Sequence, residues 1–432
     1  MELTKTKLFY FGAAIVLIIA GYLIYRYGFD PTPLARGAIK VWGFEDENIY
    51  KYSSFIKDFN ARYPRINIDY IRKSPQNYER ELLNALASGQ GPDVFPIYHT
   101  WVSNYQDKIV PLPGDLMSFK DYYDIFVDVA SQDFVVDGSI WAVPFYVDTL
   151  ALYWNKDFFN AAGIAQPPAT WDKFLEAVKI LTLRDANGNI VRAGTAMGAG
   201  ANVDHASDIL LLLMLQNGTT MLDSQTGKAI FNQSRLESGQ NYNPGEDALR
   251  FYTDFANSQK EVYTWNSLLG NSTDAFSAGR AATMINYSSA ASEISQKTPY
   301  LNFAIAPVPQ IKEGGVAVNY ADYWGEAVWT GSKNQRVAWL FVLWQTSSDV
   351  QKSLLQMVKK PASRRDVITW QKGDPVLGVF ASQALSARSW PQFDHVAISN
   401  IFTQMIDSVV MGQATTVEAL GRAVNQLNAF RK

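Results

Sequence analysis

Aromatic side chains near acidic and amide groups are the residues of this chain best suited to bind a ligand. Aromatic residues make up 13% of the 432, with 12 Trp and 22 Tyr, and many stand where strands are expected to end. A sugar ring has an apolar face and a polar rim, so a sugar site needs flat aromatic rings beside carboxylates and amides. As a set these residues favour carbohydrate binding, although core packing explains any single aromatic residue equally well. The ligand-binding candidates are Trp42, Glu45, Asp46, Tyr98, Trp101, Tyr146, Asp148, Asn202, Trp265, Tyr287, Trp324, Glu326, Arg365 and Trp390, and Tyr320, Asp322 and Trp329 belong to the same wider set.

Residues for catalysis or metal binding form no known pattern. The three histidines, His99, His205 and His395, share no metal-ligand spacing and no serine–acid pattern, so we expect surface or hydrogen-bonded side chains. Segment 185–196 begins like a calcium loop, but Ile190 stands where that loop needs Gly. We interpret its start as a hairpin turn and expect no catalytic residue, no metal and no cofactor.

Composition excludes several classes of protein. The formal charge is −3, and the 38 Lys and Arg residues are interspersed with 41 Asp and Glu, so no basic face for nucleic acid is expected. The absence of Cys from the sequence excludes a disulfide framework, a zinc–thiolate site and a lipidated cysteine anchor. With 432 residues, 47% of them hydrophobic, the chain is long enough for two or three folded domains.

An uncharged apolar segment lies near the N-terminus, over residues 8–25. At about 1.5 Å rise per residue it nearly spans a hydrocarbon core of about 30 Å. No Ala-x-Ala-like cleavage site comes after it, which favours an uncleaved anchor over a cleaved signal peptide. Lys5 and Lys7 precede it, so the positive-inside rule places the N-terminus in the cytoplasm and the rest of the chain outside. The predicted division is 1–7 as a cytoplasmic stub, 8–27 as a transmembrane anchor and 28–37 as a linker.

Hydrophobic periodicity predicts an α/β lobe after the linker. Strands and helices alternate there, which implies right-handed crossovers and a largely parallel sheet. Ligands bind such sheets beyond the carboxyl ends of the strands, here residues 42–46 and 98–101. The expected strands are 39–44, 66–70 and 92–97, and the expected helices are 52–63 and 78–88.

A strand over 143–153 is apolar except for Asp148 and is long enough to leave one compact unit and enter the next. The strand and the residues after it read VPFYVDTLALYWNKDFFNAAGI and PPATWDKF, and this segment resembles the extracellular solute-binding proteins of family 1, the maltose-binding-protein-like receptors of ABC importers. Further segments fall in the order of that family: VWGFEDE, FNARYP, GQGPDVF, AFSAGRAATMIN, APVPQ, ADYWGEAVWTGSKN and KKPASRRDV. The resemblance covers roughly residues 38–430.

The resemblance implies a periplasmic-binding-protein-like α/β fold of two lobes joined by a hinge of three chain crossings. The expected lobes are 38–146 with 286–332 and 147–285 with 333–432, because strand 282–286 should return to the first lobe and helix 335–345 should start the last return to the second. Its function would be to capture a carbohydrate between the lobes by hinge closure and to deliver it to ABC transporter permease subunits. We expect a monomer that is not an enzyme.

Two alternatives remain open from the sequence. One is an anchored extracytoplasmic hydrolase or lyase acting on glycans, which would need an acid and a base in the cleft. The other is a receptor of the same fold for a peptide, a polyamine or a lipid fragment, or a sensor without a transporter. Within the cleft, Trp324 is predicted to stack on the ligand with Asp148 and Glu326 nearby, because two acids in the segment 322–326 are costly in a dry core.

Overall fold

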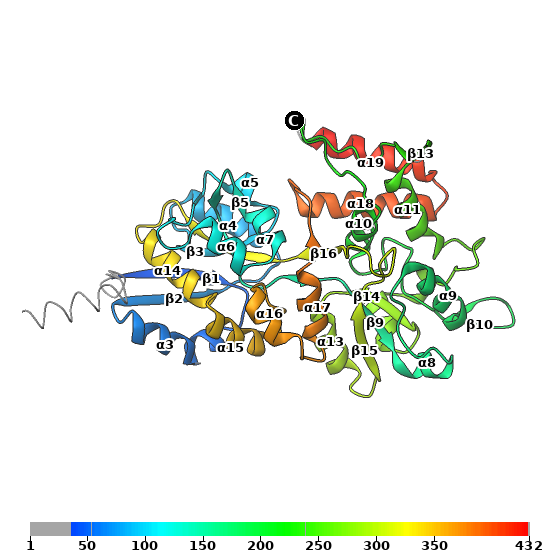
Figure 1. Ribbon diagram of the computed structural model, residues 1–432, viewed down its shortest axis with the longest axis horizontal. Coiled ribbons are helices and arrows are strands. Elements are labelled where there is room, and N and C mark those ends of the chain that lie inside the picture. Colours follow the sequence, from blue (N-terminus) through cyan, green and yellow to red (C-terminus); the bar gives the residue numbers. More distant parts are fainter. Residues whose placement is uncertain (1–35, 53, 238, 431–432) are drawn as a thin grey trace, which may run out of the picture.

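The computed structural model describes residues 36–52, 54–237 and 239–430, and these form two α/β lobes lying side by side (Figure 1). Each lobe has its own hydrophobic core. The predicted anchor at 8–27 lies outside the described residues. Within the described ranges, no helix combines the length and the apolar character needed to span a membrane.

The first lobe is built on a mixed sheet with the strand order β2-β1-β3-β17-β4, to which β7 is added beside β17. Strands β1, β2 and β3 are parallel, as predicted, whereas β17 runs antiparallel to β3. Its strands are β1 (Gly37–Gly43), β2 (Ile66–Arg72), β3 (Val94–Tyr98), β4 (Ile109–Val110), β7 (Val143–Pro144) and β17 (Trp324–Trp329), with a hairpin of β5 (Val135–Val136) and β6 (Ser139–Ile140). Its helices are α2 (Glu47–Tyr52), α3 (Ser54–Arg62), α4 (Tyr78–Ala87), α5 (Val102–Tyr105), α6 (Phe119–Ile125), α7 (Asp128–Phe134), α14 (Gln335–Gln345), α15 (Ser348–Val358) and α16 (Arg365–Gln371).

The second lobe is built on a three-stranded sheet with the order β14-β9-β15. Its central helix α10 is buried on almost every side, because its sequence ILLLLML leaves no polar face. Its strands are β9 (Ala151–Asn155), β14 (Thr283–Asn286) and β15 (Phe303–Pro307), with hairpins of β10 (Leu183–Arg184) and β11 (Ile190–Arg192) and of β12 (Arg235–Glu237) and β13 (Gln240–Tyr242). Its helices are α8 (Lys156–Ala161), α9 (Trp171–Leu181), α10 (Ala206–Gln216), α11 (Pro244–Asp254), α12 (Ser272–Ser277), α13 (Ser289–Lys297), α18 (His395–Val410) and α19 (Thr416–Phe430), with a short 3-10 turn at Ser267–Leu269.

Three short strands connect the lobes: β8 (Asp148–Thr149), β16 (Asn319–Asp322) and β18 (Ala387–Arg388). They pair side by side in the order β18-β16-β8. The predicted crossing strand 143–153 is divided into β7, β8 and β9, which belong in turn to the first sheet, the connection and the second sheet. The adjacent helix α17 (Leu377–Ala384) contributes Phe380 to the second core and Ala381 and Ala384 to the first.

The lobe boundaries predicted at 286 and 332 need correction. Strands β14 and β15 both pair with β9, so the chain stays in the second lobe until about residue 320. The return to the first lobe is the step from β16 to β17. Helix α14 then packs in the first core through buried residues such as Trp339 and Phe341, so residues 333–371 belong to the first lobe. Apolar strands and helices look alike in sequence whichever core they join, and strand pairing decided which core that was.

Helix caps explain where several elements begin. Asn155 is 2% exposed, and its side chain accepts hydrogen bonds from the backbone N–H groups of Asp157 and Phe158 at the start of α8. Thr170 caps α9 in the same way, its side chain accepting from the Lys173 N–H. The turn at 185–189 is a hairpin between β10 and β11, as predicted.

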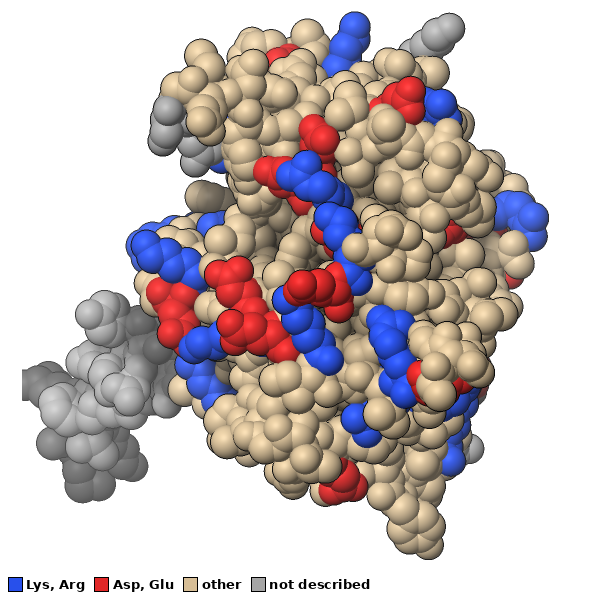
Figure 2. Space-filling model, turned by 90° about the vertical axis from the view of Figure 1, so that its right-hand side faces the viewer, with Lys and Arg blue, Asp and Glu red and all other residues tan. Residues whose placement is uncertain are grey.

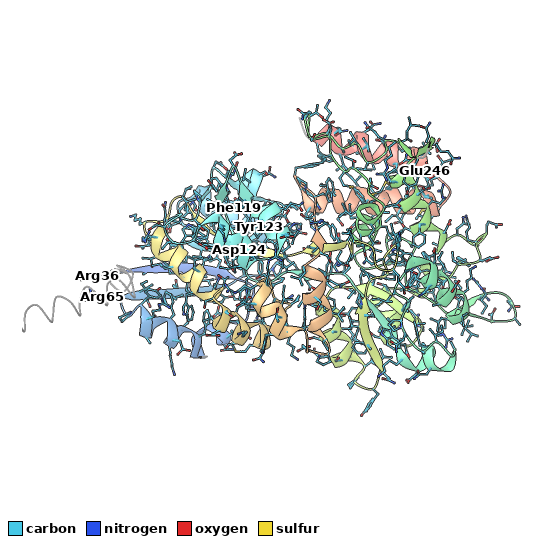
Figure 3. All side chains as sticks on the ribbon, in the orientation of Figure 1. Arg36, Arg65, Phe119, Tyr123, Asp124 and Glu246 are labelled. Atoms are coloured by element: carbon cyan, nitrogen blue, oxygen red, sulfur yellow. The ribbon has the colours of Figure 1, made fainter. Side chains whose placement is uncertain are left out.

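The described chain begins at the end of the first lobe that lies far from the second. Figure 3 places Arg36 and Arg65 together at that end, and the Gly37 N–H donates to the Arg65 carbonyl. Phe119 and Tyr123 lie on α6 of the first lobe, with about half of each side chain exposed. These two side chains therefore lie at the surface of the first lobe.

Candidate functional site

An aromatic cluster lies at the carboxyl end of β3 and the start of β17. Trp324 is half-buried, and its ring meets those of Phe44, Tyr78, Tyr98 and Trp101 edge to face, with centroids 4.9–5.7 Å apart. The strand register explains the proximity, because Trp324 is directly opposite Tyr98. Phe44 and Tyr78 were not among the sequence-predicted residues, and their position at a strand end and a helix start was the available signal.

Asp322 lies at the centre of the junction between the lobes. It ends β16, directly opposite Asp148 of β8, and its Oδ1 is buried without a hydrogen-bond partner among the described residues. Burial, together with the negative charge of Asp322, raises the pKa of the hydroxyls of Tyr98 and Tyr146 above the usual range. The carboxylate therefore faces aromatic side chains that present hydroxyl groups.

The second lobe contributes Tyr287, Asp208 and His205 to the same junction. The Tyr287 hydroxyl donates to Asp208 Oδ2 over 3.0 Å, and His205 Nδ1 lies 3.6 Å from the same oxygen. Burial disfavours the charged form of Asp208, but the hydrogen bond and charge of His205 outweigh it and lower the pKa of Asp208. The charge of Asp322 also reaches Tyr287 and His205, which places all three near one another.

Direct hydrogen bonds join the two lobes beside this junction. The Tyr98 hydroxyl lies 3.2 Å from His395 Nδ1 at the start of α18, and the Asn104 side chain donates to the Phe393 carbonyl over 2.9 Å. Sequence reasoning expected only surface or hydrogen-bonded histidines, and His395 is hydrogen-bonded. Its partner Tyr98 is 297 positions away in the chain, so residue spacing could not predict this hydrogen bond.

Two buried carboxyl groups lie close to the hinge. Burial raises the pKa of Glu326 to about 8, with a smaller contribution from the charge of Glu45, and its Oε2 has no hydrogen-bond partner among the described residues. Burial likewise raises the pKa of Asp148 to about 6, although the charge of Lys360 and hydrogen bonds from Ser288 oppose this. The Ser288 hydroxyl donates to Asp148 Oδ2 over 2.6 Å and so ties the start of α13 to β8. Near neutral pH Glu326 therefore holds its proton and can both donate and accept hydrogen bonds, whereas Asp148 is largely ionised and accepts them.

A cavity of about 190 Å³ opens between the lobes next to the Asn104–Phe393 hydrogen bond. Thr100 from the first lobe faces Trp390 and Gln392 from the second, and each of these side chains is at least nine-tenths buried. Each has a polar atom without a partner among the described residues: the Thr100 hydroxyl, the Trp390 Nε1 and the Gln392 Oε1. Unpaired buried polar atoms are costly, so this cavity is suited to a polar ligand that satisfies them.

Other contacts of sequence-predicted residues lie within the first lobe. Trp42 is 7% exposed with the Lys73 ammonium 3.9 Å from its ring centroid, while Trp101 stacks on Tyr105. The Asp46 side chain accepts from the Asn48 N–H in a local turn.

Three predicted residues are placed elsewhere, and the structure corrects them. Trp265 is 0% exposed in the second core, where its indole N–H donates to Asn202, and Asn202 also donates to the carbonyls of Asn266 and Gly270. Both therefore stabilise the loop before α12, since a fully buried indole with a satisfied N–H is a packing residue. Arg365 forms an ion pair with Asp128 over 2.5 Å within the first lobe.

Known proteins share this two-lobed geometry. The family model for bacterial extracellular solute-binding protein matches residues 46–352. The chain belongs to this family. The predicted resemblance is thereby confirmed, and so is the α/β fold of the sugar-binding periplasmic proteins.

Curated relatives of this family member are distant. A putative binding protein of Brucella abortus is 22% identical over 66% of this chain and 65% of its own length, so the match spans about two thirds of that relative. The maltotriose-binding protein of Pyrococcus abyssi is 22% identical over 72% of this chain and 63% of its own length.

Solved structures of similar fold include two sugar-binding proteins. The cyclic alpha-maltosyl-1,6-maltose binding protein of Arthrobacter globiformis has a TM-score of 0.74 and 19% identity, covering 91% of this chain and 99% of its own. The sugar-binding protein MalE of Xanthomonas citri has a TM-score of 0.74 and 19% identity, covering 91% of this chain and 97% of its own. At these identities the likeness shows the fold.

The outer surface of the protein carries charges of both signs. Figure 2 shows Lys and Arg side chains beside Asp and Glu along one stripe of the face it displays. Ion pairs of the second lobe, such as Lys179–Glu261 at 2.6 Å, neutralise such charges locally. On this face neither sign of charge forms a separate patch.

Proposed function

We propose that this solute-binding protein captures a neutral carbohydrate between its lobes and delivers it to an ABC importer. The observation that carries the proposal is the junction itself, where the buried Oδ1 of Asp322, which has no hydrogen-bond partner in the described part of the chain, lies among ring-bearing residues of both lobes. Sugar hydroxyls would donate to such an oxygen, and sugar CH faces would pack on the rings. The Pyrococcus relative and the Arthrobacter structural neighbour bind maltotriose and a cyclic maltosyl sugar, which supports the same class of ligand.

Hinge motion supplies the mechanism of capture in this proposal. A ligand that contacts Asp322 on one side and the Asp208–Tyr287 pair on the other favours the closed arrangement over the open one by its extra contacts. The three short connecting strands permit such a motion because few backbone hydrogen bonds join them. We propose that the protein acts as a monomer and that residues 8–27 tether it to the membrane on the extracytoplasmic side.

Replacement of Asp322 tests the ligand site most directly. We expect Asp322→Ala to weaken binding of the preferred sugar by about 10- to 100-fold, since a hydrogen bond to a charged group contributes about 1.5–3 kcal/mol. Titration calorimetry against a panel of mono- and oligosaccharides measures this. Asp349→Ala is the matched control, because its side chain is 98% exposed on α15. Equal affinity of the Asp322 variant and the wild type would exclude this carboxylate from the site.

Trp324→Ala is a less selective probe than the sequence suggested. Because four aromatic rings surround it, its removal will also lower the free energy of unfolding, by about 3 kcal/mol or more if the space does not collapse. Trp324→Phe keeps a ring in the cluster and is the better comparison. We expect the Phe variant to retain most of the stability and to lose about tenfold in affinity.

A turnover assay addresses the enzymatic alternative. The same glycans incubated with the full-length protein should be recovered unchanged, because a receptor needs binding alone. Release of shorter products that disappears in Glu326→Gln or Asp148→Asn would establish a hydrolase or lyase instead.

A further inference from the structure

A second groove crosses the lobe junction on the side away from the aromatic cluster. Its volume is about 620 Å³, within the range of about 300–1,000 Å³ for small-molecule sites. Helix α13 of the second lobe forms one wall, and α15 and α16 of the first lobe form the other. Figure 1 shows these helices on one side of β16, whereas α5 and α18, which flank the cavity near Trp390, lie on the opposite side.

Side chains in this groove are free to bind a ligand. Trp370 of α16 is 43% exposed, although most large apolar side chains of this chain are buried, and no ring or cation packs on it among the described residues. The side chains of Ser292, Gln296 and Gln356 line the groove and make no hydrogen bond within the described chain. An exposed indole beside hydroxyl and amide groups offers an apolar surface with neutral donors and acceptors around it.

Charges in the groove are few and nearly balanced. Lys359 contributes one cation, and Asp374 contributes one carboxylate that already accepts from the backbone N–H groups of Val376 and Leu377. An anionic or cationic ligand would therefore find little net attraction, and a purely apolar ligand would cover the free amides. The lining suits a small polyhydroxylated molecule with an apolar face.

We propose that this groove is a second binding site, separate from the junction around Asp322, for a neutral sugar of about disaccharide size. The indole of Trp370 stacks on a ring face, and Gln296, Gln356 and Ser292 exchange hydrogen bonds with the hydroxyls. Ser288, whose hydroxyl donates to Asp148 at the hinge, also lines the groove. This groove has lining residues of its own, so the proposal does not depend on the sugar site proposed at the junction.

The test uses the full-length protein and three neutral disaccharides, maltose, cellobiose and lactose, titrated by calorimetry to high millimolar concentration. Asp322→Ala weakens binding at the junction, so the event that remains with unchanged affinity reports the groove. In that background we expect Trp370→Ala to weaken the remaining event by about tenfold or more. Met357→Ala is the matched control, because Met357 is 44% exposed on α15 beside Gln356 and does not line the groove.

Each outcome decides the matter. The groove site is supported if Trp370→Ala weakens the remaining binding event and Met357→Ala leaves its affinity unchanged. A remaining event that is unchanged in Trp370→Ala, an equal loss in both variants, or no remaining event with any of the three sugars overturns it. If the wild-type protein shows only an event that depends on Trp370 and ignores Asp322, the groove site stands and the proposed site at the junction fails.

Discussion

Glu326 should make the stability of this protein depend on pH in a direction opposite to that of an ordinary paired carboxylate. Burial and the charge of Glu45 raise the pKa of Glu326 from an ordinary value of 4.5 to about 8 in the folded protein. Between these two values the folded state holds a proton on Glu326 and the unfolded state does not. The free energy of unfolding therefore falls as the pH rises through this window.

The magnitude comes from the two pKa values of Glu326. Each pH unit inside the window costs about 1.4 kcal/mol, so raising the pH from about 5.5 to about 7.5 should cost about 3 kcal/mol. Glu326→Gln removes this contribution, because a neutral amide of similar shape replaces the protonated acid. The variant should match the wild type within about 1 kcal/mol near pH 5 and exceed its stability near pH 7.5.

Urea unfolding of both proteins at several pH values measures the effect. Asp148, whose pKa burial raises to about 6, contributes in the same direction in both proteins, so the difference between them isolates Glu326. Glu176→Gln, on the exposed side of α9, controls for the loss of a negative charge at the surface. Parallel pH profiles for wild type and Glu326→Gln would refute the assignment of a proton to this buried carboxyl.

Three further predictions concern stability and location. Trp265→Ala should lower the free energy of unfolding by about 3–5 kcal/mol and leave sugar affinity unchanged below the melting temperature, because this indole packs the second core; a selective loss of affinity in calorimetry would contradict that role. Asn155→Ala should destabilise the protein by about 1 kcal/mol in chemical unfolding and Asn155→Asp by less, since the cap of α8 needs a side-chain oxygen; equal losses would argue against capping. Deletion of residues 1–30 should move the protein from the membrane fraction to the soluble fraction, and unchanged membrane association would disprove the predicted anchor.

Much of the fold could be predicted because local chemistry encodes it. The alternation of strands and helices after residue 38 gave the parallel part of the first sheet, and the apolar run around Asp148 gave the first crossing between lobes. The hairpin turn at 185–189 also forms within a few residues of chain, where sequence reasoning is strongest. The crossing expected at strand 282–286 and the lobe assignment of β15 and α14 were wrong, because an apolar sequence shows that a segment is buried but not in which core.

Like the fold, the candidate site could be predicted only in part. By itself the sequence determined the family, the aromatic richness and the acidic segment 322–326, because these depend on residue types and short spacings. Only the tertiary structure brought Asp208, His205 and His395 of the second lobe up to Tyr98 and Asp322, and only it buried Trp265 away from them. Contacts across 79 to 297 residues arise from strand pairing and lobe packing, whose register is fixed by the whole core and leaves no local pattern in the chain.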